Sequence, residues 1–327
     1  MKKILGMGNA LTDILLQIDN DNVLFSLNLP KGSMQLVDDE KSQEISQTLN
    51  NYTRKMATGG SASNTINGIT RLGADAGFIG KVGKDDIGLF FTNDSHENGV
   101  TPHLSLSETP SGRCIVLVTP DGERTLCTFL GAACELLAED LTTNMFQGYD
   151  IFHIEGYLVQ NHDLIRTAVR LAKEAGLQVS LDLASYNVVE ENLDFLHEII
   201  REYVDIVFAN EEESWAFTGQ VPTDALVSIS NLCDIAVVKI GKEGSYIKSG
   251  NDMVQIKPRL ANCIDTTGAG DLYAAGFLYG LALNYSLEVC GKIGSLVSGK
   301  VVEVLGAKME NEVWTDIQNE IKEIVNS

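Results

Sequence analysis

A glycine-rich segment, Asp265-Thr-Thr-Gly-Ala-Gly-Asp271, runs directly into an apolar segment, Leu272-Tyr-Ala-Ala-Gly-Phe277. The apolar segment predicts a helix, and the glycines before it predict a helix start whose backbone N–H groups are open to a ligand. Such a start binds anions, because its first N–H groups lack partners and the helix dipole adds partial positive charge. A phosphoryl group suits this site, and Asp271 is placed to accept a proton from an attacking hydroxyl. A tight turn with Asp271 as a helix cap is the alternative interpretation.

A second glycine segment, Gly59-Gly-Ser-Ala-Ser-Asn64, follows an expected strand at Lys55–Thr58 and opens another expected helix. Gly59 and Gly60 permit close approach of a ligand to the backbone. Asn64 offers a donor and an acceptor to hydroxyl groups, as a polyol requires. Glycine pairs are also common in ordinary turns, so this segment alone leaves both interpretations open.

Four further polar residues lie at or just after the ends of expected strands. Asn210 and Glu213 lie one helical turn apart after the strand at 206–209, where an amide and a carboxylate suit the water shell of Mg²⁺. Asp13 follows the first strand and is a candidate to bind vicinal hydroxyls of a substrate. Glu155 ends another strand and is a candidate either to contact the substrate or to support residues that do. An N-capped acidic helix explains Asn210 and Glu213 as well, and a turn aspartate explains Asp13.

Short apolar runs alternate with amphipathic stretches along most of the chain, which predicts an α/β fold with a mostly parallel sheet covered on both faces. A helical layer is expected from about residue 267 onward, over 272–283, 287–304 and 313–324. The expected strands are Ile4–Met7, Ala76–Gly80, Ile151–Ile154, Val179–Leu183, Ile206–Ala209 and Ile235–Ile240.

Two regions, approximately 14–37 and 100–129, break this rhythm. The second contains two alternating segments on either side of the turn Pro120-Asp-Gly122. They predict a small antiparallel sheet, inserted into one continuous domain over residues 1–327 and acting as a lid.

The net charge of −21 makes nucleic acid and anionic membranes poor partners. The six cysteines form no C-x-x-C pair, which favours a reduced, cytoplasmic protein. No segment reaches the roughly 20 apolar residues that span a bilayer.

Two common nucleotide motifs are incomplete. Gly6-x-Gly8 lacks the third glycine of a dinucleotide fingerprint, since Leu11 stands there, so only periodicity supports an NAD-dependent dehydrogenase. The run Gly294–Lys300 copies most of a P-loop, but Val301 replaces the required Ser or Thr and the run lies in an expected helix.

The segments 265–271, Gly59-Gly-x-x-x-Asn64 and Asn210-x-x-Glu213, in this order and spacing, resemble the ribokinase (PfkB) family. The resemblance covers nearly the whole chain. It implies a ribokinase-like α/β fold with a central, mostly parallel sheet, flanking helices and a small β-sheet lid through which members often dimerise.

The resemblance also implies that ATP donates the phosphoryl group, with Mg²⁺ and in some members K⁺. Asp271 would be the base, the N–H groups of Gly268, Ala269 and Gly270 the anion hole, and Asp13, Gly59, Gly60, Asn64 and Glu155 the substrate residues. Nucleotide contacts are expected from Asn210, Glu213, Lys239, Gly241, Gly244 and Thr267, with Glu213 reaching Mg²⁺ through water.

At position 239 the family commonly has Thr where this chain has Lys, which bears on nucleotide contacts. The segments 8–13, 31–36 and 128–133 look most like bacterial adenosine-kinase-like members. We therefore expect transfer to a primary hydroxyl of a nucleoside such as adenosine. A free-sugar kinase (ribose, fructose or 2-keto-3-deoxygluconate) and a non-catalytic nucleoside- or sugar-binding protein are the alternatives.

Overall fold

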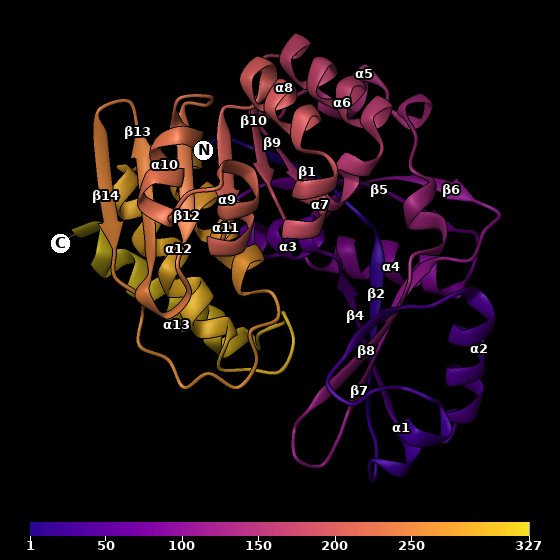
Figure 1. The fold of residues 1–327 in the computed structure, drawn as a ribbon. Coiled ribbons are helices and arrows are strands. Elements are labelled where there is room, and N and C mark those ends of the chain that lie inside the picture. Colours follow the sequence, from indigo (N-terminus) through magenta and orange to yellow (C-terminus); the bar gives the residue numbers. More distant parts are fainter. Residues whose placement is uncertain (327) are drawn as a thin grey trace.

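The computed structural model describes residues 1–326 and shows a large sheet between two layers of helices, with a small sheet at one side (Figure 1). In these residues the large sheet has nine strands. All neighbouring pairs are parallel except the two that involve β13. The order is β14 (Asp252–Ile256), β13 (Ser245–Ser249), β12 (Ile235–Lys239), β11 (Ile206–Ala209), β10 (Gln178–Asp182), β9 (Ile151–Glu155), β1 (Ile4–Met7), β5 (Ala76–Gly83) and β6 (Val100–Ser107).

The predicted ribokinase-like α/β class is confirmed, and all six strands expected from the apolar runs lie in this sheet. The hairpin of β13 and β14 was not predicted. Only three residues of these two strands are buried, and polar residues are mixed in, so the strands lack the continuous apolar signal of buried strands.

Helices cover both faces of the large sheet. Successive side chains of a strand point to opposite faces, so Ile4 of β1 joins one hydrophobic cluster while Leu5 and Met7 join the other. The helices on the Ile4 face include α3 (Ser61–Leu72), α11 (Ala269–Ala282), α12 (Leu287–Val301) and α13 (Asn311–Asn326); those on the other face include α6 (His162–Glu174), α8 (Leu193–Tyr203) and α10 (Pro222–Ser230).

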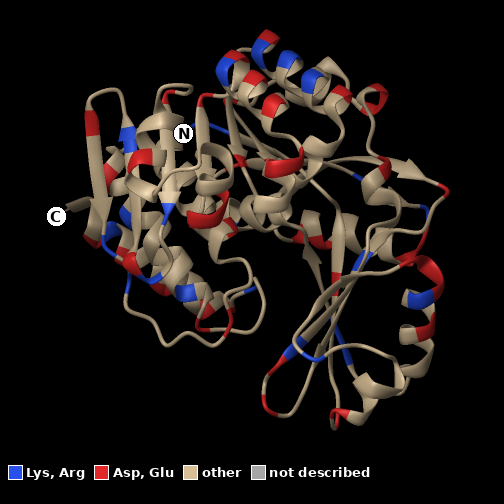
Figure 2. Cartoon of the chain, in the orientation of Figure 1, with Lys and Arg blue, Asp and Glu red and all other residues tan. Residues whose placement is uncertain are grey.

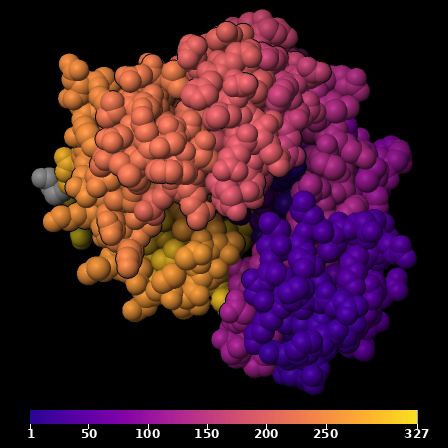
Figure 3. Space-filling view, in the orientation of Figure 1, coloured from indigo at the N-terminus to yellow at the C-terminus, as the bar shows by residue number. Residues whose placement is uncertain are grey.

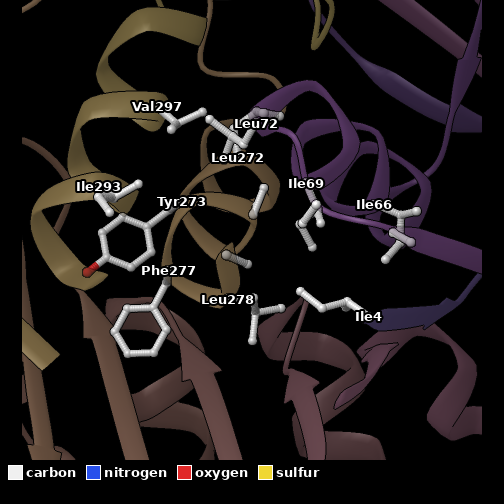
Figure 4. Close-up of a cluster of buried hydrophobic side chains, with 14 of the residues drawn as sticks. Ile4, Ile66, Ile69, Leu72, Leu272, Tyr273, Phe277, Leu278, Ile293 and Val297 are labelled. Atoms are coloured by element: carbon white, nitrogen blue, oxygen red, sulfur yellow. The ribbon is translucent and has the colours of Figure 1, made fainter. Parts of the chain in front are cut away.

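Close packing of α11 fixes the position of its first turn. Figure 4 shows Leu272 and Phe277 of α11 among Ile66 and Ile69 of α3 and Ile293 of α12. A Cβ on Gly276 would lie 2.8 Å from the carbonyl oxygen of Ile293, so only glycine lets α11 and α12 approach this closely. The P-loop-like run 294–300 lies inside α12, as predicted, and serves this packing.

The small sheet is formed by β3 (Met34–Leu36), β8 (Arg124–Phe129), β7 (Gly112–Val118), β2 (Leu11–Gln17) and β4 (Arg54–Gly59), in that order. One of its faces packs on α1 (Asn22–Ser26) and α2 (Asp39–Thr48). The β2–β7 and β3–β8 pairs are parallel, so the sheet is mixed, and the prediction of an antiparallel sheet is wrong in this respect.

The predicted lid boundaries also need correction. The segment 100–107 is β6, which pairs with β5 at the edge of the large sheet, and β4 belongs to the small sheet although 54–59 lies outside the predicted segments. An edge strand with one exposed face alternates polar and apolar residues just as a small separate sheet does, which explains the misassignment.

The remaining helices are α4 (Asp86–Glu97), α5 (Thr143–Phe146), α7 (Tyr186–Glu191) and α9 (Glu211–Thr218). Figure 2 shows that Asp and Glu, coloured red, are spread over the helices of the body and over the small sheet with its helices. Within residues 1–326, no helix combines the length and the apolar character needed to cross a membrane.

Candidate active site

A pocket of about 890 Å³ lies between the inner face of the small sheet, the carboxyl ends of the large-sheet strands and the start of α11. Figure 3 shows the hollow between the small-sheet lobe and the C-terminal half of the body. Residues predicted from five distant segments meet here. The predicted site residues that line it are Asp13, Gly60, Asn64, Asn210, Glu213, Lys239, Gly241, Gly244, Thr267, Ala269, Gly270 and Asp271.

Asp271 is the third residue of α11, and its carboxylate points to α3. Its Oδ1 accepts a hydrogen bond from Ser61 Oγ at 2.8 Å, and its Oδ2 accepts one from Asn64 Nδ2 at 3.0 Å. Burial raises the pKa of Asp271 to about 6, although the hydrogen bonds from Asn64 and Ser61 lower it. The side chain is therefore held by another helix, ionised at neutral pH and more basic than an ordinary aspartate, which suits a general base.

The glycine-rich loop gives α11 an open start. Gly268 has φ +76°, and a Cβ there would lie 2.6 Å from the Cβ of Ala307, so glycine is required. The Ala269 N–H donates to the carbonyl of Thr266 at 3.1 Å, so one of the three predicted anion-hole donors is engaged in this conformation. The N–H groups of Gly270 and Asp271 are in the first helical turn, where no earlier carbonyl of the helix can accept them.

Arg124 connects the small sheet to this loop, a contact that was not predicted. Its Nη1 donates to Thr267 Oγ1 at 2.8 Å and pairs with the carboxylate of Asp265. Asp265 in turn accepts from the Thr267 N–H at 3.0 Å and the Gly306 N–H at 2.7 Å. The side chains of Arg124 and Asp265 are each 10% exposed, so this ion pair joins the two parts of the pocket wall in a largely dry environment.

The side of the pocket that carries Asp13 and Asn64 is built by β2 and the start of α3. A Cβ on Gly59 would lie 2.5 Å from the carboxylate of Asp13, so Gly59 makes room for that side chain without lining the pocket itself. Gly60 has φ +93°, and its Cβ would lie 2.2 Å from the carbonyl oxygen of Asn9. Gly60 is thus sterically required, because its φ is positive and the atom in the way belongs to the backbone, whereas Gly59 keeps the space that the Asp13 carboxylate occupies.

Asn64 has an unused acceptor at this side of the pocket. The residue is 7% exposed, its Nδ2 is bonded to Asp271, and its Oδ1 has no hydrogen-bond partner among residues 1–326. A buried polar atom without a partner is unfavourable, so Oδ1 is prepared to accept a hydrogen bond from a ligand hydroxyl.

Glu155 does not line the pocket, so the prediction of a direct substrate contact is corrected. It is 1% exposed and accepts hydrogen bonds from the Asn9 N–H (2.9 Å), Asn9 Nδ2 (2.6 Å) and the Ala62 N–H (3.0 Å). Burial raises the pKa of Glu155 to about 7. Its carboxylate ties the β1–β2 turn to the first turn of α3 and thereby positions the residues on both.

Asn210 and Glu213 form a reciprocal cap at the start of α9. The Asn210 N–H and Nδ2 each donate to Glu213 at 2.7 Å, and the Glu213 N–H donates to Asn210 Oδ1 at 2.8 Å. Burial raises the pKa of Glu213 to about 7. Both carboxylate oxygens are therefore occupied by Asn210, so Glu213 does not fit a direct metal ligand.

No set of three or more His, Cys, Asp or Glu side chains within residues 1–326 is arranged to hold a metal ion. This fits Mg²⁺ that enters with a nucleotide and keeps most of its water, for which no dedicated protein cage is needed.

Asp182 also lines the pocket, at the carboxyl end of β10, and was not predicted. The rule that ligands bind where parallel strands end would have identified it.

A helix start that is open to anions, carries a basic carboxylate and lies beside an acceptor for hydroxyls is the arrangement expected of a phosphotransferase that acts on an alcohol group. Residues 32–313 match the pfkB family carbohydrate kinases, and the chain belongs to this PfkB family. It is 30% identical over 243 residues to an uncharacterized sugar kinase of Archaeoglobus fulgidus, which is 74% of this chain and 96% of that protein.

Two solved structures share nearly the whole chain. A probable sugar kinase from Rhizobium etli has a TM-score of 0.85 at 32% identity, and adenosine kinase from Sinorhizobium meliloti has a TM-score of 0.84 at 34% identity. Each alignment covers 98% of this chain and 99% of the other. The chain is therefore an ATP-dependent kinase of the sugar or nucleoside type that phosphorylates a hydroxyl group.

Proposed function

We propose that this kinase transfers the γ-phosphoryl group of ATP to the primary hydroxyl of a purine nucleoside such as adenosine. The observation that carries the proposal is the apolar wall of the small sheet, formed by Leu11, Cys114, Val116 and Leu126, which lines the pocket on the side of Asp13. A flat nucleobase gains free energy by covering such a wall, whereas a free sugar, with hydroxyls on every side, does not. The similarity to adenosine kinase supports the same choice.

The mechanism follows from the positions of the side chains. Asp13 and Asn64 hold ribose hydroxyls, and Asp271 accepts the proton of the primary hydroxyl as its oxygen attacks the γ-phosphorus. The bond from that phosphorus to the β-phosphate oxygen breaks, and the first-turn N–H groups of α11 stabilise the charge on the transferred group. Bound Mg²⁺ would neutralise phosphate charge, with Asn210 and Glu213 reaching its water shell.

The nucleotide side of the pocket is lined by Gly241, Gly244, Pro258 and Val302 and by three small residues of α12, Ser295, Ser298 and Gly299. We assign ATP to this side of the pocket because a nucleotide bound there would direct its phosphates toward the open start of α11. The small sheet acts as a lid that excludes water, and the Arg124 contact to Thr267 supports this role.

Two further expectations rest on the family resemblance, dimerisation and activation by K⁺, and a third rests on the cysteines. A homodimer through the small sheet is supported by exposed apolar residues on β3 (Met34 and Leu36) and on the adjoining helix α1 (Phe25). A cytoplasmic location is supported by the six cysteines, which are all free. Activation by K⁺ stays a prediction.

The proposal is tested by measuring ADP release with Mg²⁺–ATP and adenosine, guanosine, inosine, cytidine, ribose, fructose or 2-keto-3-deoxygluconate. Selective turnover of a purine nucleoside is the expected result. Turnover of a free sugar alone would replace the proposal by a sugar kinase. Binding of adenosine without ADP release would favour the non-catalytic alternative.

We expect Asn64→Ala to raise the acceptor KM by at least about tenfold. The hydroxyl of the acceptor loses its hydrogen bond to the buried side chain of Asn64, and such a bond contributes about 1.5 kcal/mol to binding. Initial rates over a range of acceptor concentrations measure this effect. The matched control is Asn144→Ala, at an exposed position outside the pocket. An unchanged KM for the best acceptor would remove Asn64 from the binding site.

The activity should rise with pH around pH 6. The base must be ionised, and burial raises the pKa of Asp271 to about 6, so protonation below this pH removes the proton acceptor. The free-enzyme value appears in the profile of kcat/KM against pH, measured between pH 4.5 and 9. A lower limb near pH 4, where an unperturbed aspartate titrates, would contradict this assignment.

A further inference from the structure

Lys239 is the last residue of β12 and extends into the pocket beside the start of α11. Its Nζ donates to Asp182 Oδ2 at 2.9 Å, and the two side chains are 15% and 8% exposed. The same Nζ is only 3.3 Å from the point that a Cβ on Gly270 would occupy. The ammonium group therefore lies against the turn of backbone that is open to anions.

The surroundings of this ammonium group are strongly acidic. Burial lowers the pKa of Lys239, but the carboxylates of Asp182 and Glu213, together with Asp271, raise it by more, so the side chain is charged at neutral pH. These carboxylates come from β10, α9 and α11. A phosphate entering this region would be repelled by three carboxylates if no protein cation were present.

We propose that Lys239 contacts the phosphoryl group that is being transferred, and that Asp182 holds the lysine in place for this contact. An ammonium group has three donors, so Nζ can keep its bond to Asp182 while it donates to a phosphate oxygen. The negative charge on the transferred group is then met by Lys239 on one side and by the N–H groups of α11 on the other. Asp182 is a positioning residue, since its carboxylate orients the lysine.

This inference rests on the ATP-dependent kinase activity of the chain and does not depend on which acceptor is used. A purely structural role is the competing explanation, because a buried carboxylate such as Asp182 requires a partner whether or not a phosphate binds. The two explanations differ in what happens when both members of the pair are neutralised.

The test compares Lys239→Met, Lys239→Arg and the double variant Lys239→Met/Asp182→Asn in the full chain. We expect Lys239→Met to lower kcat about 100-fold, the usual loss when one charge-stabilising donor is removed. Lys239→Arg should recover part of that loss, and the double variant should remain as slow as Lys239→Met. The double variant carries no unpaired Asp182 carboxylate, so it keeps the test valid if Lys239→Met alone does not fold.

A binding measurement separates this inference from the choice of acceptor. We expect Lys239→Met to weaken the binding of a non-hydrolysable ATP analogue about tenfold more than the binding of ADP. This is the loss expected when one charge-assisted hydrogen bond to the γ-phosphate is removed. The control is Lys81→Met, which breaks the Lys81–Asp140 ion pair of the same length (2.9 Å) and similar burial, outside the pocket. Its affinities should match the wild type.

Recovery of kcat to within about threefold of the wild type in the double variant would show that Lys239 only balances Asp182 and would overturn the proposal. If Lys239→Met weakens the binding of the ATP analogue and of ADP by the same factor, the proposal is also overturned. If adenosine proves to be the wrong acceptor, the binding ratio still decides the role of Lys239.

Discussion

The Asp271→Asn variant is expected to lose at least about 100-fold in kcat, the usual lower range for removal of a general base. An amide cannot accept the proton of the attacking hydroxyl at neutral pH. The change is nearly isosteric, and the amide oxygen can still accept from Ser61 Oγ as Asp271 Oδ1 does at 2.8 Å. The new amide NH2 replaces Oδ2, which accepts from Asn64 Nδ2, so Asn64 must turn its unpartnered Oδ1 toward it to accept. The loss should therefore appear in kcat measured at saturating ATP and acceptor.

The same variant should be at least as stable as the wild type at pH 7.5. Burial raises the pKa of Asp271 to about 6 from 3.8, so its contribution to stability is fully present below pH 3.8 and lost as the pH rises through about 6. At pH 7.5 the ionised carboxylate is unfavourable, and Asn removes that charge. Urea unfolding at this pH measures the change.

Asp224→Asn, at an exposed position of α10, is the matched control and should leave both kcat and the free energy of unfolding unchanged. Near wild-type turnover in a folded Asp271→Asn variant would exclude Asp271 as the base. A slow variant that is also strongly destabilised would instead indicate a structural role.

The Glu155→Ala variant is expected to lower the free energy of unfolding by about 3 kcal/mol or more. It leaves the Asn9 N–H, Asn9 Nδ2 and the Ala62 N–H without their acceptor, and each unsatisfied buried donor costs about 1–3 kcal/mol. Because Glu155 is 1% exposed, water cannot replace the carboxylate without rearrangement. Urea unfolding measures the loss.

Glu155→Gln separates positioning from stability. It keeps one oxygen and the shape of the side chain, so we expect a smaller loss of stability but a raised acceptor KM, since Glu155 joins the segments that carry Asp13 and Asn64. The control, Glu174→Ala at an exposed position of α6, should change the free energy of unfolding by less than about 0.5 kcal/mol. A similarly small change in Glu155→Ala would contradict the positioning role.

Much of the site was predictable because its signals are local. Glycines before an apolar helix at 268–270 indicate an anion site from backbone geometry alone, and the structure places Asp271 and Asn64 around one pocket as the motifs require. The sequence could not decide between a supporting role and a substrate contact for Glu155, because a residue at a strand end gives the same signal whether it faces a ligand or, as here, two backbone N–H groups.

Contacts between distant segments were not predictable. Arg124 lies 143 residues before Thr267, and Asp182 lies 57 residues before Lys239, so no spacing rule connects them. The Ser61 hydroxyl that bonds Asp271 is 210 residues away from it. These partners depend on how the small sheet, α3 and β10 pack around the start of α11.

The amino-acid sequence by itself determined the α/β class, the six central strands, the C-terminal helices and the two glycine-rich helix starts, because periodicity and glycine geometry act over a few neighbouring residues. Only the tertiary structure decided that β6 joins the large sheet, that Arg124 reaches the loop at 265–271, and that Asp182 holds Lys239. These features depend on strand pairing and packing between residues far apart in the chain. The alternation of apolar and polar residues along a strand is the same whichever neighbour that strand pairs with, so it cannot select the partner.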